Sequence, residues 1–199
     1  MEITASIVNK LRQRTGAGIM DCKNALKESE GEMEKAIELL RTKGLASAAK
    51  KIGREAKSGQ IISYIHHDSR LGVLLELNCE TDFVARTDEF KELGNEICLQ
   101  IAAEAPTFVS REQVPAELIE KEKTIYREQA IGEGKPEATV EKIIASKLEN
   151  FYRTNCLLEM LNVRDSSQTI GSLVTLMIAK VGENIRVRRF VRFRLGEEI

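Results

Sequence analysis

The spacing of apolar residues changes along this chain and separates a helical part from a mixed part. Over residues 1–43 they recur every three or four positions, which is the period of an amphipathic helix. Over residues 61–79 they alternate with mostly polar neighbours, as in half-buried strands, and helical spacing then returns. Because no long series of alternating strands and helices follows, we predict an α+β fold with a small antiparallel sheet packed with helices.

The first part predicts a bundle of three short helices. Thr4 can cap the first helix, Thr15-Gly16 ends it, Gly18 precedes the second and Gly44 follows the third. The apolar positions expected on the inner faces are Ile3, Ile7, Val8, Leu11, Ile19, Cys22, Ala25, Leu26, Met33, Ala36, Ile37 and Leu40. A bundle of this size has only a small core.

Composition indicates where the domains end. Ala and Lys favour helix and Gly interrupts it, so residues 45–59, which contain all three, are predicted to form a helical linker. We therefore expect an N-terminal helical domain over residues 1–44 and an α+β core domain over residues 60–199.

The core domain is predicted to begin with a β-hairpin and to end with a strand. A turn at residues 67–70 joins the two strands of the hairpin. Further helices are expected to begin near Asp82, Pro115, Pro136 and Thr169. The last strand is expected over residues 184–195, with apolar side chains on one face and arginines on the other.

Arg189 and Phe190 break the alternation of the last strand. Arg189 falls on the apolar face and Phe190 falls on the basic face. A bulge would reverse the pattern of every later residue, so a simple exchange fits better. Arg189 should then pair with a carboxylate or face a partner, and Phe190 should be an exposed apolar contact. Burial of both under neighbouring helices is the alternative.

Charge and composition exclude several classes of protein. The net charge is −1, and no region is basic enough to indicate nucleic-acid binding by itself. The four cysteines and two adjacent histidines lack the spacing of a zinc site, so no metal or cofactor is expected. The N-terminus lacks a secretory pattern and no apolar run is long enough to span a bilayer, so we expect a cytoplasmic protein.

The sequence also argues against an enzyme. It contains no phosphate-binding loop, dinucleotide-binding or nucleophile-elbow motif, and no serine or cysteine has a plausible histidine base. Asp82, Asp88 and Glu89 are acids of a first helical turn, where they interact with the helix dipole. We therefore expect a binding protein. The arginine-rich last strand leaves an RNA- or ribosome-associated module as the alternative class.

The segment Glu76–Arg86 is the strongest candidate for a functional site. An apolar strand runs into a polar turn, where Thr81 or Asp82 can cap the next helix. Phe83 precedes Phe90 by seven residues on the same helical face, which favours burial of Phe83 in the core. The alternative is that an acid beside an exposed aromatic residue forms a contact with a partner.

Three stretches of the sequence resemble signatures of the bacterial translation elongation factor Ts family. They are Leu11–Leu26, Glu76–Arg86 with Thr81–Val84 at its centre, and Gly182–Phe190. The similarity extends over essentially the whole chain in the same order. It implies a short member of the family, whose N-terminal domain resembles ubiquitin-associated domains and docks on a GTPase.

The resemblance also implies guanine-nucleotide exchange on elongation factor Tu. Thr81, Asp82, Phe83 and Val84 would enter the GTPase near its magnesium site, so that Mg²⁺ and GDP are lost. Phe83 would be the exposed wedge, Asp82 would orient the turn or engage groups near the nucleotide, and Val84 would anchor the turn.

The same resemblance implies further contacts. Arg12, Met20 and Lys23 are the candidate contacts of the N-terminal domain with the GTPase, although each could instead be a solvated or packed position of the bundle. Short members of the family pair as homodimers through their core sheets, which implies a homodimer and a 2:2 complex. The sequence after Leu158 departs from the family pattern, and no structure is predicted for residues 158–168.

Overall fold

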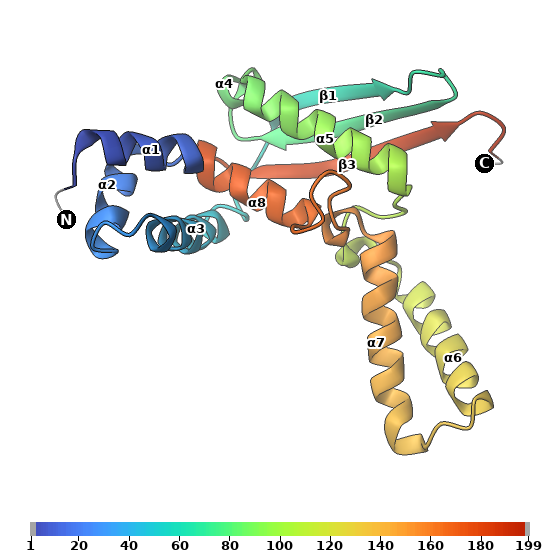
Figure 1. Ribbon diagram of the computed structural model, residues 1–199. Coiled ribbons are helices and arrows are strands. Elements are labelled where there is room, and N and C mark those ends of the chain that lie inside the picture. Colours follow the sequence, from blue (N-terminus) through green and yellow to red (C-terminus); the bar gives the residue numbers. More distant parts are fainter. Residues whose placement is uncertain (1–2, 198–199) are drawn as a thin grey trace. The chain divides into compact units, whose positions relative to one another are not determined.

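The computed structural model describes residues 3–197, and in this range the chain forms eight α-helices, two short 3-10 helices and three β-strands (Figure 1). The predicted α+β class is confirmed. Contacts group the residues into two compact units. One comprises the described part of Met1–Gly59 with Asn78–Phe90 and Val174–Arg186, and the other comprises Gln60–Leu77, Lys91–Leu173 and the described part of Val187–Ile199. The predicted domain limits at residues 44 and 59 stay a prediction.

The N-terminal segment forms the predicted three helices. They are α1 (Ala5–Thr15), α2 (Ile19–Glu28) and α3 (Met33–Ala49). Thr4 caps α1, because its Oγ1 accepts a hydrogen bond from the Ile7 N–H at 3.5 Å. Gly16 ends α1 with a φ of 67°, a left-handed conformation that glycine adopts without a Cβ penalty. Both roles were predicted from the sequence.

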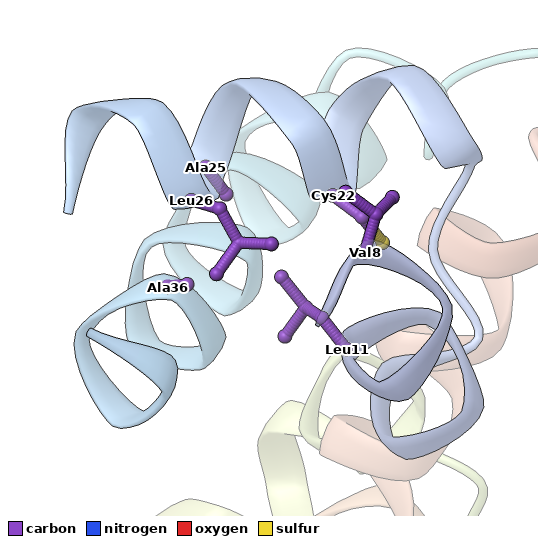
Figure 2. Packing of buried hydrophobic residues seen from close by; sticks show 6 residues of the cluster. All are labelled: Val8, Leu11, Cys22, Ala25, Leu26 and Ala36. Atoms are coloured by element: carbon purple, nitrogen blue, oxygen red, sulfur yellow. The ribbon is translucent and has the colours of Figure 1, made fainter. Parts of the chain in front are cut away.

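Six side chains from these helices form the buried centre of the bundle (Figure 2). They are Val8, Leu11, Cys22, Ala25, Leu26 and Ala36. Ile19 departs from the prediction, because it starts α2 one turn before Cys22 and remains 49% exposed, outside this cluster. Met20 beside it is 63% exposed. The first turn of α2 therefore presents two neighbouring apolar side chains to solvent.

The helix α3 continues through Gly44, where it was expected to stop, and ends at Ala49. Leucine and alanine dominate residues 45–49, and their helix propensity outweighs the roughly 1 kcal/mol penalty of one glycine. A Cβ atom at Gly44 would lie 3.3 Å from the Cβ of Ala179 in α8 (Ile170–Val181). The glycine therefore permits a close approach of the two helices within their unit.

The three strands form one antiparallel sheet with the order β1-β2-β3 (Figure 1). They are β1 (Ser58–Ile65), β2 (Leu71–Cys79) and β3 (Ile185–Arg194). The predicted turn closes the hairpin, since the His66 N–H donates to the Leu71 carbonyl at 2.8 Å. The Leu195 N–H donates to the Arg70 carbonyl at 2.8 Å, which sets the register of β3 against β2.

One face of the sheet is buried and the other is largely exposed. Helix α5 (Asp88–Glu104) covers the buried face, where a Cβ atom at Gly94 would collide with Ile62 and the Cys98 thiol lies 3.8 Å from the Ile62 carbonyl. Val73, Leu75 and Leu77 are buried on the same side. The opposite side carries six exposed apolar residues, which we name the apolar sheet face: Ile61, Ile65, Leu74, Val191, Phe193 and Leu195.

The irregular pair of the last strand is partly as predicted. Arg189 does pair with a carboxylate, because its Nε donates to Glu76 at 2.7 Å. The prediction for Phe190 is wrong, since this ring is half-buried. Because side chains alternate along a strand, Phe190 lies on the face opposite Arg189. The exposed aromatic residue of β3 is instead Phe193, at 64%.

Two long helices form an antiparallel hairpin, α6 (Ala116–Gly132) and α7 (Glu137–Asn155), and they lie side by side (Figure 1). Each begins directly after the proline that predicted it. Ala130, Val140 and Ile144 form the buried seam between them. At the other end of α7, the Arg111 guanidinium of η1 (Arg111–Gln113) binds Glu149 and Glu159.

A buried glutamine organises the segment for which no structure was predicted. After η2 (Leu157–Glu159) the chain forms an isolated antiparallel bridge between Leu161 and Thr169. The Gln100 amide donates to the Leu161 carbonyl at 3.0 Å and accepts from the Val163 N–H at 2.8 Å. Because Gln100 is fully buried, these bonds satisfy polar atoms that water cannot reach.

Candidate partner-binding site

The segment Glu76–Arg86 forms the end of β2, a two-residue connection and the short helix α4 (Asp82–Ala85). Thr81 caps α4, because its Oγ1 accepts the Val84 N–H at 3.4 Å. The Cys79 thiol donates to the Thr81 carbonyl at 3.1 Å. These two contacts fix the direction of the backbone where α4 begins.

Consecutive residues of α4 have opposite environments. Phe83 is 78% exposed, whereas Val84 is 5% and Ala85 is 4% exposed. The outward position of Phe83 that the family resemblance implied is therefore confirmed, and the burial inferred from its spacing to Phe90 is wrong. The spacing misleads because α4 ends at Ala85 and a new helix, α5, begins at Asp88, so the two rings are not on one continuous helix.

An exposed phenylalanine contributes little to the folded state and much to a complex. Full burial of such a side chain is worth about 1.5–3 kcal/mol relative to exposure. That free energy is not gained within this chain and is available when a partner covers the ring. Exposed aromatic side chains of this kind are typical anchors of protein interfaces.

The Asp82 carboxylate accepts a hydrogen bond from Arg86 Nη2 at 2.7 Å. The two side chains are 73% and 77% exposed, and they lie four residues apart. Ion pairs this open to solvent contribute about 0–1 kcal/mol. Asp82 can therefore exchange Arg86 for a group of a partner at little cost.

A concave surface that encloses a volume of about 620 Å³ lies beside Phe83, within one of the two units. Its lining comes from α1, from α4 with the following residues, and from the end of α8: Asn9, Arg12, Gln13, Gly16, Phe83, Val84, Thr87, Glu89, Lys180 and Val181. The Lys180 ammonium lies 3.6 Å from Glu89, and its aliphatic carbons pack over Gly16. The surface thus joins an exposed aromatic ring to charged side chains of both signs.

The three docking residues proposed from the sequence are not equivalent. Arg12 lines the concave surface together with Phe83, so the structure brings these two predicted residues to one site. Met20 and Lys23 are both exposed on α2 and do not line it. Met20 instead lies beside the exposed Ile19, which makes a small apolar surface with a lysine close by in the sequence.

Sequence reasoning missed Lys180 and Glu89 in this surface. Lys180 follows an apolar run in α8 whose pattern predicts only core packing. Glu89 lies in the first turn of α5, where an acid is expected to interact with the helix dipole. Their pairing depends on long-range contacts that no local pattern reveals. The signal that could have indicated Lys180 is its place as the single charged residue of α8.

The four cysteines are buried. Burial raises the pKa of Cys98 to about 12, and burial together with the negative charge of Glu183 raises the pKa of Cys79 to about 11. Among residues 3–197 no group of three or more His, Cys, Asp or Glu side chains could hold a metal ion. Over the same residues, no helix combines the length and the apolar character needed to cross a membrane.

Comparison with known proteins decides the family. The model of the family described as Elongation factor TS matches residues 4–197. The chain belongs to the elongation factor Ts family. A protein named Elongation factor Ts from Fervidobacterium nodosum is 64% identical over 197 residues, which are 99% of this chain and 100% of that protein. The proteins of that name from Caldanaerobacter subterraneus and Thermotoga neapolitana are 56% and 55% identical, over 99% and 100% of this chain and 98% and 100% of their own lengths.

Membership confirms the resemblance drawn from the three motifs and assigns the chain to translation elongation. The relatives have nearly the same length as this chain, so the α6–α7 hairpin and the sheet both lie inside the matched region. The roles of individual residues, however, follow only from the geometry described above.

Proposed function

We propose that this protein is a cytoplasmic guanine-nucleotide exchange factor for elongation factor Tu. Family membership supports the role in elongation, and the observation that carries the proposed mechanism is the 78% exposure of Phe83 on a turn in which the next two residues, Val84 and Ala85, are buried. A protein of this kind acts by binding, and its own side chains take part in no covalent step.

In this mechanism the turn Thr81–Val84 enters the GTPase near its nucleotide. Phe83 inserts between packed elements of the partner, which transmit displacement because protein interiors have few voids. GDP affinity in such GTPases rests on phosphate-loop amides and on a Mg²⁺ ion that bridges phosphate oxygens. A small displacement there weakens Mg²⁺ and GDP together, and Asp82, released from Arg86, supplies a carboxylate near the same groups.

The thermodynamics restrict what the factor can do. It must bind the nucleotide-free GTPase more tightly than the GDP complex, by the same free energy by which it weakens GDP binding. It accelerates release of GDP and of GTP and leaves their relative affinities unchanged. Arg12 and the concave surface, and separately Met20 with Lys23, contribute contacts that hold the complex while the nucleotide leaves.

The direct test is release of labelled GDP from elongation factor Tu. The wild-type protein at micromolar concentration should accelerate release well above the spontaneous rate. A folded wild-type protein that leaves the rate unchanged would contradict the proposed function.

We further propose that two copies pair through the apolar sheet face and form a 2:2 complex with the GTPase. Four of its six residues, Ile61, Ile65, Phe193 and Leu195, are each more than 60% exposed. Exposed apolar patches rimmed by polar residues mark interaction sites, and a second copy supplies a matching face by two-fold symmetry.

An RNA-binding role finds less support in the arginines of β3. Arg189 is paired with Glu76, and Arg192 lies 3.1 Å from Glu197 with its side chain only 14% exposed. Both cations are therefore already engaged by carboxylates. An RNA complex that used these two cations would need to replace these contacts, and its affinity would fall steeply with salt concentration.

A further inference from the structure

The carboxylate of Glu183 holds the threonine that begins the exposed turn. Its Oε2 accepts the Thr81 N–H at 3.0 Å and its Oε1 accepts the Thr81 hydroxyl at 2.7 Å, although 102 residues separate the two in the sequence. The same hydroxyl oxygen accepts the Val84 N–H. Glu183 therefore fixes the hydroxyl proton on one side of Thr81 and leaves the oxygen lone pairs directed at the cap of α4.

The next residue makes the reciprocal contacts. The Asn184 N–H donates to Glu80 at 2.6 Å, so each of the two segments supplies one acid that accepts hydrogen bonds from the other. The Asn184 side chain is 3% exposed, and its amide donates to the carbonyls of Ile52 at 3.2 Å and Arg54 at 2.6 Å. The exposed turn is thereby joined to the segment that follows α3.

Gly182 directs the chain so that Glu183 and Asn184 reach the turn. It ends α8 with a φ of 82°, a left-handed conformation, and its N–H donates to the Ile178 carbonyl at 3.0 Å. The chain then reverses direction and places Glu183 and Asn184 beside residues 80 and 81. The contacts of Glu183 and Asn184 give a structural role to the start of the signature stretch Gly182–Phe190. The proposed exchange mechanism assigns no other role to these residues.

A four-residue helix cannot hold its own conformation, because helix nucleation is unfavourable at that length. The direction of Phe83 must therefore be set by the anchors of α4, which are the buried Val84 and Ala85 and the contacts of Thr81. Among the contacts of Thr81, those to Glu183 involve a charged acceptor and come from a distant segment. Charge-assisted hydrogen bonds are shorter and stronger than neutral ones.

We propose that Glu183 is a positioning residue for nucleotide exchange, which holds the turn Thr81–Val84 in its binding-competent conformation and, with Asn184, links it to the segment after α3. The proposal rests on the exchange function proposed above. A turn that is competent for only a fraction of the time binds with its affinity reduced by that fraction. Loss of Glu183 should consequently weaken binding of the GTPase more than it slows GDP release from the formed complex.

The test measures labelled-GDP release against concentration of the factor for wild type, Glu183→Ala and Glu183→Gln. We expect the half-saturating concentration to rise about 3- to 10-fold in Glu183→Ala and by a smaller factor in Glu183→Gln, which keeps one acceptor oxygen. The rate at saturation should stay within about twofold of wild type, as expected for a change of competent fraction alone. Glu141→Gln, which removes an exposed ion pair of the α6–α7 hairpin, is the matched control and should change neither quantity.

Amide hydrogen exchange supplies a second measurement that does not depend on the GTPase. In Glu183→Ala the Thr81 amide should exchange at least about tenfold faster, while amides of α6 and α7 keep their protection. If Glu183→Ala does not fold, the isosteric Glu183→Gln carries both measurements. An unchanged half-saturating concentration in a folded variant, beside an active wild type, would overturn the positioning role alone. An inactive wild type would instead refute the exchange function.

Discussion

Phe83 and Val84 are adjacent in α4, yet one side chain is 78% exposed and the other is 5% exposed. The buried residue anchors the turn and the exposed one is free to contact a partner. Substitutions at the two positions should therefore separate stability from function.

We expect Phe83→Ala to change the free energy of unfolding by less than about 0.5 kcal/mol, as is usual for exposed positions. Val84→Ala should lower it by about 1–3 kcal/mol, because it leaves a cavity under α4. Urea unfolding followed by circular dichroism measures both values. A larger loss of stability in Phe83→Ala than in Val84→Ala would contradict the assigned environments.

Gly16 should be sensitive to substitution and Gly53 should tolerate it. Gly16 has a φ of 67°, and a Cβ atom there would lie 3.3 Å from Lys180 Cε. Gly16→Ala should lower stability by about 1 kcal/mol or more, because an L-residue is strained in this conformation. Gly53 has open space around its Cβ position, so Gly53→Ala is the matched control and should leave the thermal midpoint nearly unchanged.

The apolar sheet face makes the proposed dimer testable. Phe193→Glu places a charge where a second copy would bury an aromatic ring, and it should shift the protein to monomer in gel filtration with light scattering. Ile131→Glu is the matched control, because Ile131 is similarly exposed at the end of α6 and lies outside this face. A wild-type protein that is monomeric at all concentrations would contradict the dimer.

Stability should fall in alkaline solution because of the buried thiols. The pKa of Cys98 is raised to about 12 from an ordinary value of 9.0, so the folded state holds this proton more tightly than the unfolded state. The contribution of the Cys98 thiol to the free energy of unfolding is complete below about pH 9. It is lost as the pH rises toward 12, by at most about 1.4 kcal/mol per pH unit. Urea unfolding at pH 8 and at pH 10.5 measures the change. Between these two pH values, the free energy of unfolding should fall less in Cys98→Ala than in wild type. Equal losses in the two proteins would contradict this cause.

Much of the fold could be predicted from the sequence because its signals are local. Thr4 and Gly16 mark the ends of α1, and the alternation over residues 61–79 marks the hairpin. The error at Phe83 arose because a seven-residue spacing to Phe90 does not reveal that the helix is interrupted between them. In β3, the alternation predicts which side chains share a face of the sheet. Which of those side chains are buried depends on helices elsewhere in the chain.

The candidate site depends on contacts that are distant in the sequence. Glu183 reaches Thr81 across 102 residues, and Lys180 reaches both Gly16 and Glu89. No periodicity or capping rule predicts such pairs, because they are fixed only when the segments pack. The family resemblance identified the turn Thr81–Val84, but it did not identify what holds the turn in place.

The most direct test of the account compares wild type and Phe83→Ala in release of labelled GDP from elongation factor Tu at saturating factor. If Phe83 is the wedge, the folded variant should still bind the GTPase in a pull-down but should lose most of the acceleration, on the order of tenfold or more. Thr42 is an exposed position of α3 outside the concave surface, and the Thr42→Ala variant should accelerate GDP release as much as wild type does. Acceleration by folded Phe83→Ala equal to that of wild type would contradict the central claim.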